Sequence, residues 1–155
     1  MWAAEHGLNL VVGNICAGKG LETNDFGAAQ LAQIRVYRQK FAGPGRPQVI
    51  AGRVIAPLDS ADAATRRKYR DYQASRHQRT LAPIGERRIL IAPDLVGTSA
   101  EIVESLRADP VLAEVTELQL ELPYAFAHEE YEQILSDAAT SVAPQLGWSA
   151  KPFPG

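Results

Sequence analysis

A glycine-rich segment near the start of the chain comes closest to a known chemical motif. Residues 13–20 read Gly-Asn-Ile-Cys-Ala-Gly-Lys-Gly and differ by one residue from the phosphate-binding P-loop pattern. A P-loop needs Ser or Thr after its Lys to hold magnesium, and a helix that starts at once. Here Gly20 follows Lys19, and residues 21–24 delay the next helix. The segment favours a flexible strand-to-helix loop, with nucleotide binding as the weaker alternative.

Other reactive side chains lack the partners that their chemistry needs. Cys16 lies where a strand is expected to end, but no base near it in the sequence would activate its thiol, so a buried bystander is favoured. The three histidines show no metal-ligand spacing. Tyr124 and Phe126 suit either the mouth of a ligand site or packing under the last helix. The residues alone therefore identify no catalytic group and no metal site.

Composition is that of an ordinary globular protein. The chain has 155 residues, of which 46% are hydrophobic and 22% charged, which fits one domain. No apolar stretch approaches the length of a membrane span, and no signal peptide is evident. A single cysteine fits a reducing cytoplasm. We expect a cytoplasmic protein without membrane partners.

Charge is balanced overall but unevenly distributed. The near-equal totals, 16 basic and 18 acidic residues, give no argument for nucleic-acid binding. Eight Lys and Arg lie between Arg66 and Arg88, whereas eleven Asp and Glu lie from Asp94 onward, opposed there only by Arg107 and Lys151. Solvated helix faces explain this pattern. The alternative is that the basic stretch meets a phosphate or another anion.

Strand and helix patterns alternate along the chain. Gly7 suits the end of a short helix whose start has no capping residue. The expected strands are residues 8–15, 49–56 and 115–122, the last of which alternates apolar and polar side chains. The expected helices are residues 26–41, capped by Asp25, residues 59–73, residues 98–107 and residues 128–142. Thr98 and Glu101 form a capping box.

This alternation predicts an α/β fold with parallel strands joined by right-handed crossovers. Three parallel strands leave unpaired edges and an uncovered sheet face. The chain is therefore expected either to be part of a barrel or to find its missing strands in a partner.

Three segments resemble the C-terminal part of the bacterial luciferase-like flavin-dependent monooxygenases. Residues 2–12, Trp-Ala-Ala-Glu-His-Gly-Leu-Asn-Leu-Val-Val, are similar to the family's helix-Gly-strand that leads into strand six. Residues 95–101, Leu-Val-Gly-Thr-Ser-Ala-Glu, resemble a helix start of the family, with Ser99 in place of its usual Pro. Residues 118–148 resemble the last strand and helix of the barrel.

The resemblance implies a partial (β/α)8 TIM barrel, with strands six to eight and their helices in residues 1–148 and a tail in residues 149–155. Such a barrel binds reduced FMN, or in relatives the deazaflavin F420, at the C-terminal ends of its strands. Gly13, Asn14 and Ile15 would then lie beside the flavin ring, where the luciferases have Trp at the position of Asn14.

By the same likeness, residues 77–94 correspond to a mobile lid that shields the flavin from water. Arg79, Arg87 and Arg88 would be its phosphate or substrate contacts. The implied full enzyme is an oxidoreductase acting on a small organic molecule with oxygen, while the cofactor does the chemistry.

The family's phosphate-binding turn and its first-half catalytic residues have no counterpart in this sequence. Three lost charge-assisted hydrogen bonds, at roughly 1.5–3 kcal/mol each, remove on the order of 5–9 kcal/mol. Micromolar binding is worth only about 8 kcal/mol in total. We expect the isolated chain to hold FMN weakly or not at all and to be inactive without a missing N-terminal half. The alternative is a non-catalytic half-barrel that forms a homo-oligomer.

Overall fold

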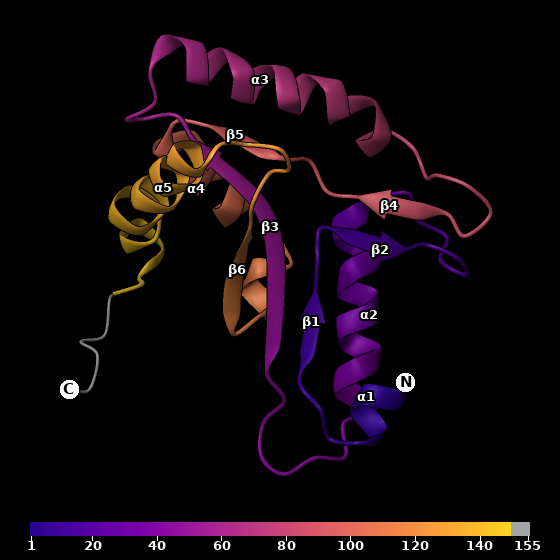
Figure 1. Ribbon diagram of the computed structural model, residues 1–155. Coiled ribbons are helices and arrows are strands. Elements are labelled where there is room, and N and C mark those ends of the chain that lie inside the picture. Colours follow the sequence, from indigo (N-terminus) through magenta and orange to yellow (C-terminus); the bar gives the residue numbers. More distant parts are fainter. Residues whose placement is uncertain (150–155) are drawn as a thin grey trace.

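A single long strand, β3 (Val49–Pro57), forms the centre of the sheet in the computed structural model, which describes residues 1–149. It pairs in parallel with β1 (Leu10–Val12) on one edge and with β6 (Glu117–Glu121) on the other. Near its C-terminal end it also pairs in parallel with β5 (Leu95–Gly97). The predicted α/β class and parallel pairing are confirmed, and the described residues form no closed barrel (Figure 1).

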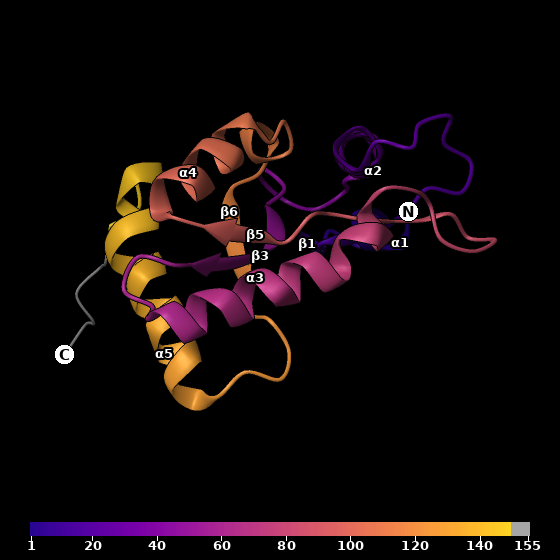
Figure 2. The same ribbon diagram turned by 90° about the horizontal axis from the view of Figure 1, so that it is seen from above.

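Helices surround this sheet on one face and at one end. In Figures 1 and 2, α2 lies alongside β1. Helices α4 and α5 lie near the C-terminal end of β3, and α3 crosses the C-terminal ends of the strands. Their bounds are α1 (Trp2–Glu5), α2 (Phe26–Lys40), α3 (Ala63–His77), α4 (Ser99–Ala108) and α5 (His128–Asp137). Two short strands, β2 (Ile15–Ala17) and β4 (Ile89–Ile91), form a separate antiparallel ribbon.

The core lies between the sheet and its helices. Val49 and Ala51 of β3 pack with Ile34 and Tyr37 of α2. Further along β3, Ile55 packs against α4 through the buried side chains Ile102, Val103 and Leu106.

The opposite face of the sheet is open only around β1 and the start of β3. Val11 is 57% exposed, and its register neighbours across the sheet are Ile50 and Glu117, of which Glu117 is exposed. Further along β3 on this face, Val54 and Ala56 are buried. Within residues 1–149 the sheet therefore has two unpaired edges and a face that is open around Val11.

Several local predictions are confirmed. Gly7 has φ of +66°, and a Cβ there would lie 2.7 Å from the Cα of Gly43, so both conformation and space require glycine. Asp25 caps α2 by accepting the N–H of Ala28. Thr98 and Glu101 form the expected capping box at the start of α4.

Other boundaries differ from the prediction. The strand expected over residues 8–15 ends at Val12, because the chain bends at residues 13–14 and enters the ribbon. The helix expected from Asp59 or Ser60 begins at Ala63, because Asp62 supplies the cap. Leu135, expected on the buried stripe of the last helix, is 47% exposed.

Two further findings concern the ends and the helices of the chain. Of the predicted tail, residues 149–155, all but Ser149 lie outside the described residues. No helix within residues 1–149 is long and apolar enough to cross a membrane.

Candidate functional site

Strands β1, β3 and β6 are parallel, so their C-terminal ends point the same way, although the register sets Val12, the last residue of β1, beside Ala51, well before β3 ends at Pro57. We call the region formed by residues 13–15, 58–60 and 122–126 the strand-end face. In α/β proteins this is where ligands bind, because connecting loops gather there. Here α3 and the β2–β4 ribbon lie across it (Figure 1).

Hydrogen bonds from three separate segments fix the backbone at Gly13 and Asn14. Gln30 of α2 donates from Nε2 to the Gly13 carbonyl at 2.8 Å. The Asn14 N–H donates to Oε1 of Glu121 at 3.2 Å, and the Asn14 carbonyl accepts the Ala92 N–H at 2.8 Å. These bonds leave the Asn14 amide side chain and the apolar Ile15 side chain, 55% exposed, to meet a ligand.

Glu121 reaches this bend across Gly52. A Cβ at Gly52 would lie 2.0 Å from Glu121 Oε1 and 2.9 Å from its Cδ. The carboxylate therefore occupies the space that any larger residue in β3 would fill. Gly52 and Glu121, from neighbouring strands, together position the Asn14 backbone.

A buried arginine supports the same bend from the helix side of the sheet. Arg53 of β3 is only 3% exposed, and its Nε donates to Asp109 Oδ2 at 2.8 Å. Its Nη2 donates to Gln30 Oε1 at 2.8 Å, and Gln30 in turn holds Gly13. Because every polar contact of the guanidinium is internal, Arg53 acts as a positioning residue.

Cys16 is buried in β2, as predicted. Burial raises the pKa of its thiol above the usual 9.0, and the nearby charge of Arg53 only partly opposes this shift. A buried thiol with a raised pKa is a poor nucleophile at neutral pH.

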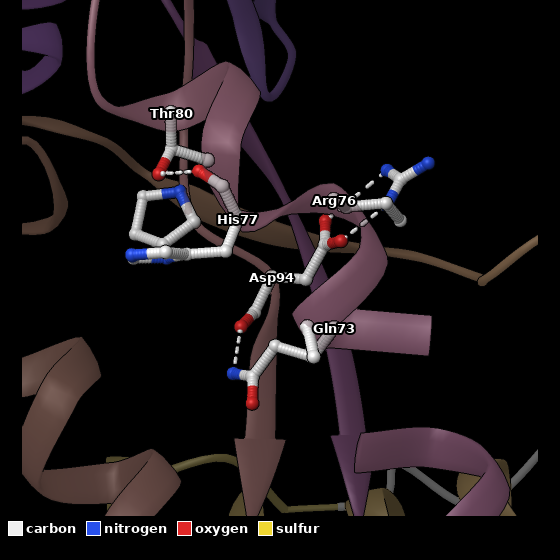
Figure 3. Close-up of a pocket in the computed structure, with 7 residues that line it drawn as sticks. Gln73, Arg76, His77, Thr80 and Asp94 are labelled. Carbon is white, nitrogen blue, oxygen red and sulfur yellow. Dashed lines mark hydrogen bonds and ion pairs between the residues drawn. The ribbon is translucent and has the colours of Figure 1, made fainter. Parts of the chain in front are cut away.

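A small pocket of about 120 Å³ lies where α3 meets the segment before β5 (Figure 3). Most of its polar groups already have partners. Arg76 binds the buried carboxylate of Asp94 through two nitrogens, and Gln73 donates to the Asp94 carbonyl at 2.7 Å. The pocket thus holds a structural ion pair that fastens α3 to the segment before β5, and the imidazole of His77, which also lines the pocket, makes no hydrogen bond within residues 1–149.

The same arginine orders aromatic side chains at the strand-end face. The guanidinium of Arg76 lies 4.5 Å from the Tyr72 ring centroid and 5.8 Å from that of Tyr124. Tyr124 remains 74% exposed. Phe126 instead stacks on Tyr69 with centroids 4.8 Å apart. Of the two aromatic residues noted in the sequence, Tyr124 faces solvent at this end of the sheet and Phe126 packs.

The lid arginines differ from one another in their surroundings. Arg79 lies in a 3-10 turn (Gln78–Thr80), and its Nε is buried without a hydrogen-bond partner. Arg88, with φ of +50°, donates to Asn24 Oδ1 at 2.6 Å, and its Nε is likewise buried and unpaired. Arg87 is exposed. Arg88 thus joins the expected lid segment to the loop before α2.

The Gly13–Gly20 segment does not have the form of a P-loop. Its middle residues, 15–17, are β2, and α2 begins only at Phe26. Its backbone therefore does not curl into a cradle that leads directly into a helix. Residues 1–149 also contain no group of three or more His, Cys, Asp or Glu side chains arranged to bind a metal ion.

Sequence reasoning missed the residues that hold the site. Arg53 gave a signal, since it is the one charged residue in an otherwise apolar strand. Glu121 and the pair Arg76–Asp94 gave none, because their partners lie far away in the sequence.

Comparison with known proteins adds no assignment. No model of a protein family matches the chain, and no curated protein sequence matches it.

Proposed function

We propose that this chain is the strand-six-to-eight part of a luciferase-like flavin-dependent oxidoreductase. The observation that carries the proposal is the strand order: β1, β3 and β6 lie side by side in the order in which they occur in the chain and are parallel, as consecutive strands of a (β/α)8 barrel are. The short strand β5 departs from this order, because it precedes β6 in the chain and also pairs with the end of β3. Asn14 follows β1, and Tyr124 follows β6. The open sheet face and the two unpaired edges are where the other strands of a barrel would continue.

The residues at the bend fit one face of a flavin ring. A planar, largely apolar ring needs a rigid platform with few competing polar groups. Ile15 offers exposed apolar surface, and the Gly13–Asn14 backbone is fixed by bonds to Gln30, Glu121 and Ala92. Asn14 has an amide side chain free for the polar edge of the ring. A bound reduced flavin, FMN or F420, would supply the redox chemistry on a small organic substrate.

The described residues offer fewer contacts to the phosphate of such a cofactor than to its ring. The glycine-rich segment forms a ribbon strand instead of a cradle, and Lys19 and Arg87 are exposed cations in turns. The Nε atoms of Arg79 and Arg88 are buried, so they do not reach an anion in this conformation. In the proposed enzyme the β2–β4 ribbon excludes water from the strand-end face, and the remaining strands complete the phosphate site.

Calorimetric titration of the isolated chain with FMN tests this proposal. We expect binding much weaker than micromolar, because the phosphate contacts are incomplete. Ile15→Asp removes apolar surface and adds a negative charge, so it should weaken binding about tenfold or more. Leu135→Asp places the same charge at an exposed apolar residue of α5 and should leave binding unchanged. A submicromolar constant, or equal binding by wild type and Ile15→Asp, contradicts the proposal.

A non-catalytic half-barrel is the second candidate. The observation that favours it is the open sheet face on which Val11 is 57% exposed and which a partner would cover. Sedimentation analysis separates the two candidates. A stable dimer that Val11→Lys dissociates, without flavin binding, supports association as the function.

A further inference from the structure

The carboxylate of Glu121 lies on the face of the sheet opposite α2. Ala51 and Arg53, on either side of Gly52 in β3, turn their side chains towards α2, and successive side chains of a strand point to opposite faces. A Cβ at Gly52 would lie 2.0 Å from Glu121 Oε1, so this oxygen lies over Gly52 on the other face. A Cβ at Gly13 would lie 3.0 Å from the same oxygen. The Glu121 side chain therefore reaches from β6 across β3 to the end of β1.

Glu121 is half-buried and has an acceptor that the described residues leave unused. Its one hydrogen bond within residues 1–149 comes from the Asn14 N–H, at 3.2 Å from Oε1. None of the ion pairs in this part of the chain includes Glu121. An ionised carboxylate has about four acceptor sites, and a carboxylate that becomes enclosed needs donors or a cation. In a completed barrel, Oε2 of Glu121 would therefore require a further donor.

The bend beside Glu121 is the part of the strand-end face to which we assign the flavin ring, so the ring can supply this donor. The pyrimidine edge of a flavin carries an N3–H between two carbonyl oxygens, in FMN and F420 alike and in both oxidation states. An ionised carboxylate accepts hydrogen bonds and donates none, so it suits this N–H. The phosphate of the cofactor carries the same sign of charge as Glu121 and is repelled from it. Glu121 thus distinguishes the two ends of the cofactor.

We propose that Glu121 orients the flavin by accepting its N3–H, so that the pyrimidine edge of the ring faces the bend and the phosphate points away from it. Asn14 lies at the same bend, and its side-chain amide offers an N–H to a neighbouring carbonyl of the ring. This orientation agrees with the scarcity of phosphate contacts among the described residues. The inference rests on the proposed function, because it assigns an orientation to the cofactor proposed there.

Titration with two flavins tests this orientation on the full chain. Oxidised FMN carries the N3–H, whereas 3-methyl-FMN has a methyl group in its place and cannot donate there. Each flavin is added to the ¹⁵N-labelled chain, and the amide shifts of residues 13–15 in nuclear magnetic resonance spectra give a dissociation constant even where binding is weak. We expect FMN to bind about tenfold more tightly than 3-methyl-FMN, because the methylated ring loses a hydrogen bond to a charged acceptor.

Conservative variants separate contact with the flavin from support of the fold. Glu121→Gln keeps an oxygen that can accept the Asn14 N–H but removes the charge. It should weaken binding of FMN about fivefold and leave binding of 3-methyl-FMN nearly unchanged, because a neutral acceptor bonds the N3–H less strongly. Glu104→Gln, the same change at an exposed residue of α4, should alter neither dissociation constant. A purely structural role of Glu121 would weaken binding of both flavins by the same factor.

Two results would overturn this inference alone. One is binding of FMN at residues 13–15 that is no tighter than binding of 3-methyl-FMN. The other is an equal loss of affinity for both flavins in Glu121→Gln. A third result, no amide shift at residues 13–15 when FMN is added, would overturn the proposed function and this inference together. Failure of the orientation is therefore distinguishable from failure of flavin binding.

Discussion

Gly52 is the residue on which the geometry of the strand-end face depends most directly. In Gly52→Ala the new Cβ displaces the Glu121 carboxylate, which approaches within 2.0 Å of that position. The Asn14 N–H then loses its acceptor. We expect a loss of about 1–3 kcal/mol in the free energy of unfolding, measured in urea, and faster hydrogen exchange at the Asn14 amide.

The double variant provides the control for this prediction. Once Glu121→Ala has removed the carboxylate, Gly52→Ala meets no obstacle from it and should cost little more. The two changes should therefore be clearly less than additive. Additive losses would mean that Gly52 and Glu121 do not act through the same contact.

We predict that replacing Arg53 lowers the free energy of unfolding far more than replacing an exposed arginine in a comparable ion pair. Arg53→Met leaves Asp109 without its partner and Gln30 without its donor, at a cost of about 3 kcal/mol in unfolding free energy. Arg38→Met breaks the pair with Glu114, whose side chains are 33% and 42% exposed, and should cost less than about 1 kcal/mol. Equal losses in denaturant unfolding would contradict the role given to Arg53.

At the level of elements, α4 should show a defined pH dependence through its capping box. The Thr98 backbone N–H holds the pKa of Glu101 below its usual value of 4.5. Since the folded pKa is lowered, the stabilisation by Glu101 is complete above pH 4.5 and is lost as the pH falls through the folded pKa. Urea unfolding should therefore show a difference between wild type and Glu101→Gln at pH 7 that shrinks in acid.

Glu104→Gln is the matched control on the same helix, since Glu104 is exposed and makes no cap. It should leave stability nearly unchanged at both pH values. A pH-independent effect of Glu101→Gln would contradict the capping role.

The β2–β4 ribbon should open more readily than the parallel sheet. Cys16 and Leu90 are cross-strand partners and both are buried. Leu90→Ala leaves a cavity beside the thiol, so labelling of Cys16 by a thiol reagent in native buffer should accelerate about tenfold or more. Val142→Ala, in a different core cluster, lowers global stability without touching the ribbon. If both variants accelerate labelling equally, the ribbon does not open independently.

Elements with strong local signals were predictable from the sequence. Asp25 and Thr98 are caps whose side chains bond within three residues, so the starts of α2 and α4 follow from the sequence alone. The alternation of strands and helices was enough for the parallel α/β class. The end of β1 was missed, because Ile15 pairs with Ile91, which belongs to a stretch of weak pattern.

For the candidate site, the sequence predicted the position along the chain but not the residues that support it. Gly13, Asn14 and Ile15 follow a strand, and strand ends gather ligands in α/β folds. Their supports, Gln30 and Glu121, come from a helix and from the last strand, and no local rule relates them to the bend.

For the whole molecule, the open sheet bears directly on the proposed function. An unpaired β6 edge and a sheet face that is open around Val11 mean that the described sheet has room for further strands.

The most direct test of the central claim is a titration of the ¹⁵N-labelled chain with FMN, followed by nuclear magnetic resonance. We predict weak binding in fast exchange, with the largest shifts at the amides of Gly13, Asn14 and Ile15 and none around Leu135. Shifts confined to other parts of the chain, or tight binding in slow exchange, would contradict the assignment of the strand-end face as an incomplete flavin site.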